Sequence, residues 1–230
     1  MKLSKRLQTI ANVVEKYKSG EVFGDIGTDH AYLPCYLVEK GIVELAYACD
    51  VKQGPLDSSK ETISSCHLEG KVIPLLGDGI APILDKKVNM ICLAGMGSYL
   101  ITEILDASKT YLNNVDVLFL QPNANIDYLR EYLFNNNYVI VDEKILKDNN
   151  HIYEVLVTKK SEKKHSLYDE FDIKFGPILK ALQPALFIEK WKKQYVVYQN
   201  IMKTLAPLSP RYKEIKHDME MIEDVLNESL

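Results

Sequence analysis

The sequence contains no apolar run that reaches the roughly 18 residues of a membrane span. Its opening residues, MKLSKR, also lack the apolar run and the small-residue cleavage site of a signal peptide. No internal repeat or low-complexity tract is visible. We therefore expect a cytoplasmic protein without a membrane partner. The composition, with 47% hydrophobic and 26% charged residues, is typical of a globular protein.

Cysteine and histidine are few and dispersed, with four of the first and five of the second in 230 residues. No two cysteines have the Cys-x-x-Cys spacing of a zinc or redox site. Each lies in or beside an apolar segment, as reduced core cysteines do: Cys35, Cys49, Cys66 and Cys92. We expect neither a metal site nor a disulfide framework.

An excess of positive charge is also missing, because the net charge is −4. Taken alone, this weakly disfavours a nucleic-acid partner, but the distribution matters more than the total. Residues 184–216 carry seven basic side chains and two acidic ones, so this stretch is locally basic. The basic residues are Lys190, Lys192, Lys193, Lys203, Arg211, Lys213 and Lys216.

Apolar strand-like runs alternate with helical periodicity through the first 160 residues. The pattern predicts strands at 21–26, 45–51, 71–75, 88–94, 115–120, 138–147 and 151–159. It predicts helices at 4–18 (capped by Ser4), 31–40, 55–68, 98–108 and 127–136. The last two strands are joined by Asp148-Asn149-Asn150, a hairpin signal. This order predicts an α/β fold with a seven-stranded sheet, parallel except for one antiparallel edge strand.

The end of the chain has a different organisation. The polar run 159–164 indicates a linker, and two amphipathic helical patterns follow at 187–205 and 212–226. Pro207 and Pro210 break the helix between them, so we expect an antiparallel helix pair. The sequence therefore predicts a domain over 1–160 and a smaller, helical, coiled-coil-like domain over 161–230.

The turn after the first predicted strand indicates the ligand. Gly27 follows the strand, and a dinucleotide-binding fingerprint would need glycine again at position 29 to let a pyrophosphate approach. That position is Asp29, whose carboxylate would repel two phosphates. An adenosine that carries a positive charge and no phosphate suits such a pocket, and S-adenosylmethionine fits this description.

Motifs spread over most of the chain resemble one family, the bacterial tRNA adenine-N1-methyltransferases that modify adenine 22. In chain order they are Asp25–Pro34, Gly54-Pro55-Leu56, Leu76-Gly77-Asp78-Gly79, Leu93–Gly97, Leu120–Asn123 with Leu129-Arg130, Ile152-Tyr153-Glu154 and Phe175-Gly176-Pro177. The resemblance implies a Rossmann-like methyltransferase domain followed by a helical domain. Ala48-Cys49 departs from the family's small residues before Asp50, and Ser98 replaces a usual glycine, which would tighten the loop near the methyl group.

For the cofactor we expect the acids and glycines that follow the strands. Asp25 would accept from the ligand ammonium or orient the loop, Asp50 would accept from both ribose hydroxyls, and Asp78 would accept from the adenine amino group. The alternative for Asp50 is a solvated carboxylate, and for Asp78 a turn-forming Asp-Gly. The full predicted set is Asp25, Gly27, His30, Asp50, Val51, Gly77, Asp78, Gly79, Ala94, Gly95 and Met96.

Methyl transfer to a neutral ring nitrogen needs no base, but it leaves the product base cationic, so a nearby carboxylate would stabilise it. Asp29 is the first candidate, with a role in holding the turn as its alternative. His30 would hydrogen-bond cofactor or base, or stabilise the turn. Tyr32 and Asn123 would stack on and bond to an extruded adenine. The Asn/Asp-Pro-Pro-aromatic signature of amino-methyltransferases is absent, and Gln121-Pro122-Asn123 is a partial analogue.

A folded tRNA would need cations along its phosphates. The candidates are Lys5, Arg6, Lys190, Lys192, Lys193, Lys203, Arg211 and Lys213, each of which is alternatively a solvated surface charge. We expect tRNA as the partner, no obligatory protein partner and a monomer.

The alternatives are a methyltransferase for another RNA position, a small molecule or a protein, and, from another class, a catalytically inactive RNA-binding protein. A nicotinamide oxidoreductase is disfavoured by Asp29.

Overall fold

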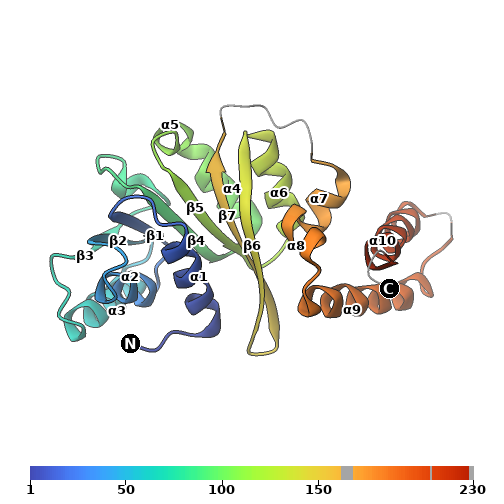
Figure 1. Cartoon of the computed structure of the whole chain (residues 1–230), viewed down its shortest axis with the longest axis horizontal. Helices are drawn as coiled ribbons and strands as arrows, with labels where there is room; N and C mark the ends of the chain where they lie inside the picture. Colours follow the sequence, from blue (N-terminus) through green and yellow to red (C-terminus); the bar gives the residue numbers. More distant parts are fainter. Residues whose placement is uncertain (162–167, 208, 228–230) are drawn as a thin grey trace. The chain divides into compact units, whose positions relative to one another are not determined.

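The chain forms two compact units, Met1–Leu167 and Tyr168–Leu230 (Figure 1). The structure is a computed structural model of the whole chain, and it describes residues 1–161, 168–207 and 209–227. Part of the predicted linker, residues 162–164, lies outside the described residues. No helix among those described is long and apolar enough to cross a membrane.

The first unit is built on one seven-stranded sheet, in the order β3-β2-β1-β4-β5-β7-β6. The strands are β1 (Val22–Ile26), β2 (Leu45–Asp50), β3 (Val72–Leu76), β4 (Met90–Met96), β5 (Val117–Pro122), β6 (Tyr138–Asp148) and β7 (His151–Lys160). Strands β1 to β5 are parallel, and β7 pairs antiparallel with both β5 and β6. The predicted mixed sheet is confirmed, with its antiparallel strand between β5 and the edge strand β6.

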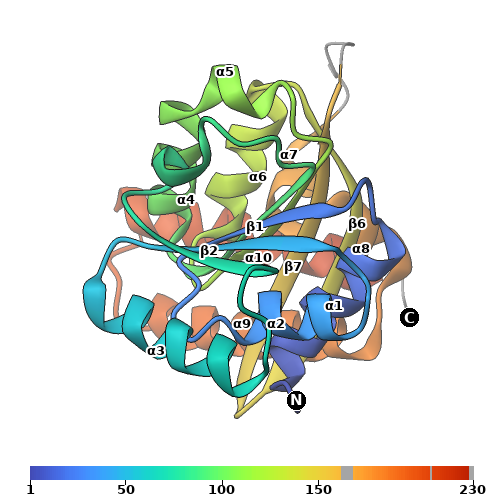
Figure 2. The ribbon, with the colours of Figure 1, turned by 90° about the vertical axis from the view of Figure 1, so that its left-hand side faces the viewer.

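Helices cover both faces of the sheet, as a parallel sheet requires. Figure 2 shows α1 (Lys5–Lys16), α2 (Tyr32–Glu39) and α3 (Gln53–Ser65) on one face, and α4 (Ser98–Ala107), α5 (Lys109–Leu112) and α6 (Ile126–Asn135) on the other. A short 3-10 helix, η1 (Ala81–Ile83), follows β3. The predicted Ser4 cap is confirmed, because its Oγ accepts from the Leu7 N–H at 3.2 Å. The apolar core includes Cys35, Cys49 and Cys92, and the four thiols are free.

The β6–β7 hairpin closes through the two-residue turn predicted from Asn149-Asn150. Both residues have positive φ, 46° and 66°, which asparagine tolerates and which matches the right-handed twist of paired strands. The prediction of this hairpin is confirmed.

Several boundaries differ by one to three residues from those predicted, and two of these differences have a clear physical reason. Strand β4 does not stop at Ala94 but continues to Met96 through a bulge at Gly95, whose φ is +80°. Helix α3 begins at Gln53 rather than Pro55, because a proline in the first turn costs no intrahelical hydrogen bond.

The second unit consists of the helices α7 (Glu170–Phe175), α8 (Pro177–Leu182), α9 (Ala185–Met202) and α10 (Pro210–Asn227). The first two were not predicted, although Asp169 and Asp172 form a capping box and Gly176, with φ +86°, separates them. The side chains of Phe175, Phe187 and Trp191 pack edge to face. Tyr195 of α9 bonds Glu223 of α10, and Gln183 donates to the Val225 carbonyl.

A buried ion cluster ties α6 to the hairpin. The guanidinium of Arg130, with no exposed side-chain surface, donates to Glu143 of β6 at 2.9 Å and to Glu154 of β7 at 2.5 Å. Both carboxylates are also buried, at 0% and 5% side-chain exposure. Since a charge in the interior is stable only when it is compensated, removing the cation would leave two buried carboxylates without its positive charge.

We predict that Arg130→Met lowers the free energy of unfolding by about 3–5 kcal/mol, measured by urea denaturation at pH 7. The control is Lys16→Met. The Lys16 ammonium pairs with Asp142 at 2.9 Å, but the side chain is 58% exposed, so we expect little change in the free energy of unfolding. Equal losses in the two variants would contradict this account of the cluster.

Candidate active site

The candidate site lies where the strand order reverses. Strand β1 has β2 on one side and β4 on the other, so the connections from β1 and β4 leave in opposite directions. A crevice forms at such a switch point, outside the carboxyl ends of the strands. A pocket of about 290 Å³ is found there, lined by α1 residues, the turn after β1 and Ala94 of β4.

The turn after β1 approaches the loop after β4 very closely. Gly27 has φ +75°, and a Cβ added to it would lie 2.3 Å from the methyl carbon of Met96. The N–H groups of Gly27 and Thr28 both donate to the Cys49 carbonyl at 2.9 Å, which fixes the turn against β2. Glycine is therefore needed here for its conformation and for its lack of a side chain.

Two further residues of this turn adopt the left-handed conformation, which is unfavourable for residues other than glycine: Asp29 (φ 56°) and Ala31 (φ 55°). Strain of this kind concentrates at functional sites. The side chain of Asp29 is 71% exposed at the pocket, and its Oδ2 lies 3.6 Å from His30 Nε2. His30 stacks on Tyr32, with ring centroids 5.1 Å apart. The predicted catalytic residues of this turn thus lie together at the mouth of the pocket.

The carboxyl group of Asp25 is buried at the floor of the pocket. It accepts from the Thr28 hydroxyl at 2.7 Å, so it orients the turn. Burial raises its pKa to about 6, opposed chiefly by the Thr28 hydrogen bond and then by the positive charge of Arg6. A cation placed against Asp25 would favour its ionised form.

Asp50 ends β2 and holds two backbone segments. Its Oδ1 accepts from the Lys52 N–H at 2.9 Å, and its Oδ2 accepts from the Asp29 N–H at 3.3 Å. Each oxygen keeps a second lone pair for a ligand hydroxyl. The next residue, Val51, is 59% exposed, and Leu76, which pairs with Asp50 at the end of β3, is 53% exposed, so exposed apolar surface adjoins this acid.

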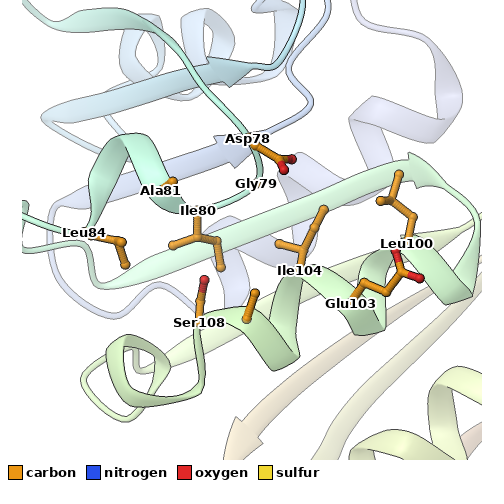
Figure 3. A pocket seen from close by; sticks show the side chains of 10 residues that line it. Asp78, Gly79, Ile80, Ala81, Leu84, Leu100, Glu103, Ile104 and Ser108 are labelled. Atoms are coloured by element: carbon orange, nitrogen blue, oxygen red, sulfur yellow. The ribbon is translucent and has the colours of Figure 1, made fainter.

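A second pocket, of about 350 Å³, lies between the β3–η1 connection and α4 (Figure 3). Asp78 and Gly79 form its rim, and the side chains of Ile80, Leu100 and Ile104 line it. It therefore combines two carboxylates, those of Asp78 and Glu103, with an apolar slot. Gly77 precedes the rim, where a Cβ would lie 2.5 Å from the ring of Pro82.

The loop after β5 is joined to the loop after β4 by Asn123. Its Nδ2 donates to the Gly95 carbonyl and its backbone N–H to the Met96 carbonyl, both at 2.7 Å. Its Oδ1 accepts from Gln121 at 3.2 Å. Both ends of the amide are thus engaged within the protein, which gives Asn123 a visible role in holding the Gly95–Met96 loop.

Arg6 lies in the first pocket rather than on the open surface. Its Nη1 donates to Gln121 Oε1 at 2.6 Å, and its guanidinium lies 5.7 Å from the centre of the Tyr153 ring. The backbone N–H of Arg6 donates to Asp148 at 3.1 Å. From the sequence we predicted that Arg6 contacts RNA, because no local pattern reveals that α1 meets β5 and the hairpin.

The remaining predicted cations are on the surface. Lys5 is exposed at the start of α1, whereas the others belong to the second unit. Lys193 pairs with Glu189 at 2.6 Å and Arg211 with Glu214 at 2.7 Å, while Lys190 lies 4.4 Å from the Trp191 ring centre. The exposed members of the predicted set in this unit are Lys192, Lys193, Lys203, Arg211 and Lys213. In the part of the chain that is described, no group of His, Cys, Asp or Glu could hold a metal ion.

Comparison with known proteins decides the family. The sequence profile of a family described as TrmK, tRNA (adenine(22)-N(1))-methyltransferase, matches residues 23–228. The chain belongs to the TrmK family. The tRNA (adenine(22)-N(1))-methyltransferase of Bacillus subtilis (strain 168) is 34% identical, over 99% of this chain and 98% of its own length. The family resemblance of the sequence is thereby confirmed, together with the expected class of enzyme.

Solved structures agree with the TrmK assignment. A Streptococcus pneumoniae protein in complex with S-adenosyl-L-methionine has a TM-score of 0.88 and 33% identity, covering 98% of this chain and 100% of its own. TrmK of M. capricolum, in complex with S-adenosyl-homocysteine, has a TM-score of 0.88 and 27% identity, with 98% of each chain covered. The similarity therefore extends through both units.

The raised pKa of Asp25 predicts a specific pH dependence of stability. Since the unfolded carboxyl titrates near pH 4 and the folded one at about 6, the unfolded state loses its proton first as pH rises. Through this group the protein loses about 2 kcal/mol of unfolding free energy between pH 4 and 7. Asp25→Asn removes that loss, so its stability relative to the natural protein should increase by this amount over the same range.

Urea denaturation at pH 4, 5.5 and 7 measures the difference between the two proteins. A difference that stays constant with pH would mean that Asp25 has an ordinary pKa in the folded state.

Proposed function

We propose that this TrmK family member transfers a methyl group from S-adenosylmethionine to N1 of adenine 22 in tRNA, with the cofactor lying across the carboxyl ends of β1, β2 and β4. The observation that carries the proposal is the buried carboxyl group of Asp25 beside Gly27, which has no side chain to block a ligand. The chain also matches the family model over residues 23–228. The tRNA substrate leads us to propose the cytoplasm as its location, and the monomeric state stays a prediction.

The residues present fit this cofactor. Asp25 offers its carboxyl group to the ammonium, and Arg6, the cation in the same pocket, suits the cofactor's carboxylate. Asp50 has lone pairs for the ribose hydroxyls, and the apolar slot at Asp78 suits the adenine ring. A pyrophosphate would instead meet the carboxylates of Asp25 and Asp29, which would repel it.

When bound, the cofactor supplies an electrophilic methyl group on a sulfonium. The adenine N1 lone pair forms the new bond, the sulfur keeps the electrons of the broken bond, and the positive charge moves to the ring. Asp29 stays accessible at the mouth of the pocket, so its carboxylate stabilises that charge. His30 and Tyr32 stack beside it and limit how the base enters.

The exposed cations provide the contacts with tRNA phosphates. Intrahelical pairs such as Lys193–Glu189 and Arg211–Glu214 are exposed and weak, so a phosphate can compete for these cations. Such contacts orient the tRNA and help to offset the few kcal/mol needed to turn an adenine out of its stack.

The activity is tested by incubating the protein with unmodified tRNA transcripts and isotope-labelled S-adenosylmethionine, followed by nucleoside mass spectrometry. We expect label in 1-methyladenosine, and none when the transcript carries guanine at position 22. Label on N6 of adenine, or in no nucleoside, would contradict the proposal.

A matched pair of glycines tests the cofactor position. Gly27 (φ +75°) and Gly41 (φ +67°) have similar left-handed backbone conformations, which would be strained for alanine at either position. A Cβ at Gly41, however, meets nothing within 4 Å. Alanine at either position should cost about 1–2 kcal/mol of stability. Gly27→Ala must also shift the Met96 methyl group, and it adds a methyl group to the wall of the pocket, so we expect its affinity for S-adenosylmethionine, measured by calorimetry, to fall at least about tenfold.

Gly41→Ala should bind the cofactor as the natural protein does. Equal affinities for S-adenosylmethionine in the two variants would mean that the contact between Gly27 and Met96 is not part of the cofactor site.

A further inference from the structure

The large apolar side chains exposed on the first unit gather at one edge of the sheet. Apart from Met1, each one in the described residues lies at the carboxyl end of a parallel strand or in the segment that follows it, Leu84 being the most distant at eight residues beyond β3. They are Tyr32, Val51, Leu76, Leu84, Tyr99, Leu100 and Tyr128. Apolar surface concentrated in this way marks a binding site rather than chance exposure.

Two of these side chains form a pair that the cofactor site does not use. Tyr99 in the first turn of α4 is 55% exposed and Tyr128 in the first turn of α6 is 40% exposed. Their ring centroids are 4.5 Å apart, with 51° between the planes. The pair therefore presents a continuous aromatic surface that remains open to solvent.

The two helices that carry the pair are fixed to each other. The Ser98 hydroxyl donates to the Ala124 carbonyl at 2.7 Å, and Tyr132 of α6 donates to Asp106 of α4 at 2.9 Å. The rings thus stand on a preformed support, which lowers the entropy cost of binding. Tyr99 follows Met96, the last residue of β4, by three positions, and Tyr128 follows Asn123 by five; Asn123 bonds the end of β4, so the pair stands at the sheet edge that carries the proposed site.

We propose that the Tyr99–Tyr128 pair is a stacking site for an unpaired nucleobase of the tRNA that neighbours the target adenine. This proposal rests on the proposed function. Aromatic side chains are the usual platforms for unstacked RNA bases. The nearby carboxylate of Asp127, whose Oδ1 accepts from the Tyr128 N–H at 3.0 Å, disfavours a phosphate and so favours the uncharged face of a base.

The site has a clear use in this reaction. When the target adenine turns out, the base next to it loses a stacking partner. Stacking on the tyrosine pair replaces that partner, and it contributes about 5- to 150-fold in affinity for one base. The contact reads no sequence, but it holds the tRNA in the register that brings adenine N1 to the methyl group.

The experiment compares Tyr99→Ala and Tyr128→Ala with Tyr99→Phe and Tyr128→Phe, which keep the rings. The dissociation constants of a tRNA transcript at several salt concentrations, and of S-adenosylmethionine, are measured for each. We expect each alanine variant to bind tRNA about tenfold more weakly, with the natural slope of log K against log salt and the natural cofactor affinity, because stacking releases no counterions. The phenylalanine variants should bind like the natural protein.

Natural tRNA affinity in both alanine variants overturns the proposal, as does a loss that comes with a smaller salt slope, which would indicate phosphate contacts. A parallel fall in cofactor affinity would indicate a structural role and would also overturn it. If the natural protein binds no tRNA, the proposed function fails as well, so the two failures are distinguishable.

Transcripts with one abasic nucleotide beside the target adenine identify the base. We expect one such transcript to bind the natural protein about tenfold more weakly and to lose nothing further with Tyr99→Ala. Fully additive losses for every transcript would mean that no neighbouring base stacks on the pair.

Discussion

The close approach of the β1 and β4 carboxyl ends is the constraint on which the site depends. Their side-by-side position in the sheet places the turn at Gly27 against Met96, whose methyl carbon lies 2.3 Å from where a Cβ at position 27 would be. The same position buries Asp25 at the pocket floor and holds Asp29 in a strained conformation at its mouth. Burial removes water from the Asp25 carboxyl group and raises its pKa to about 6, and a cationic ligand would stabilise its ionised form. The packing of the sheet is what keeps this carboxyl group buried.

Much of this arrangement could be predicted from the sequence. Buried parallel strands give continuous apolar runs, and Asn149-Asn150 has the backbone freedom of a tight hairpin, so the strands and their approximate order were readable. Asp25 and Asp50 lie at the carboxyl ends of β1 and β2, neighbouring parallel strands, so the strand pattern alone predicted both as cofactor ligands. These features depend on local patterns and on the general rules of α/β sheets.

The rest depends on contacts between distant segments. Arg6 bonds Gln121, 115 positions away, so its place in the pocket follows only from how α1 packs on the sheet. The bulge at Gly95 and the exposed Tyr99–Tyr128 pair likewise arise from how neighbouring loops meet. Membership in the TrmK family accounts for the chemistry, but these particular side chains explain how this chain would hold its cofactor and its RNA.

The most direct test of the central claim is an experimental structure of the protein with S-adenosyl-homocysteine. The account predicts the amino-acid end of the ligand beside Asp25 and Arg6, the ribose hydroxyls at Asp50 and the adenine ring in the slot at Asp78. A ligand bound away from the β1–β4 crevice, or with its adenine at Asp25, would contradict it.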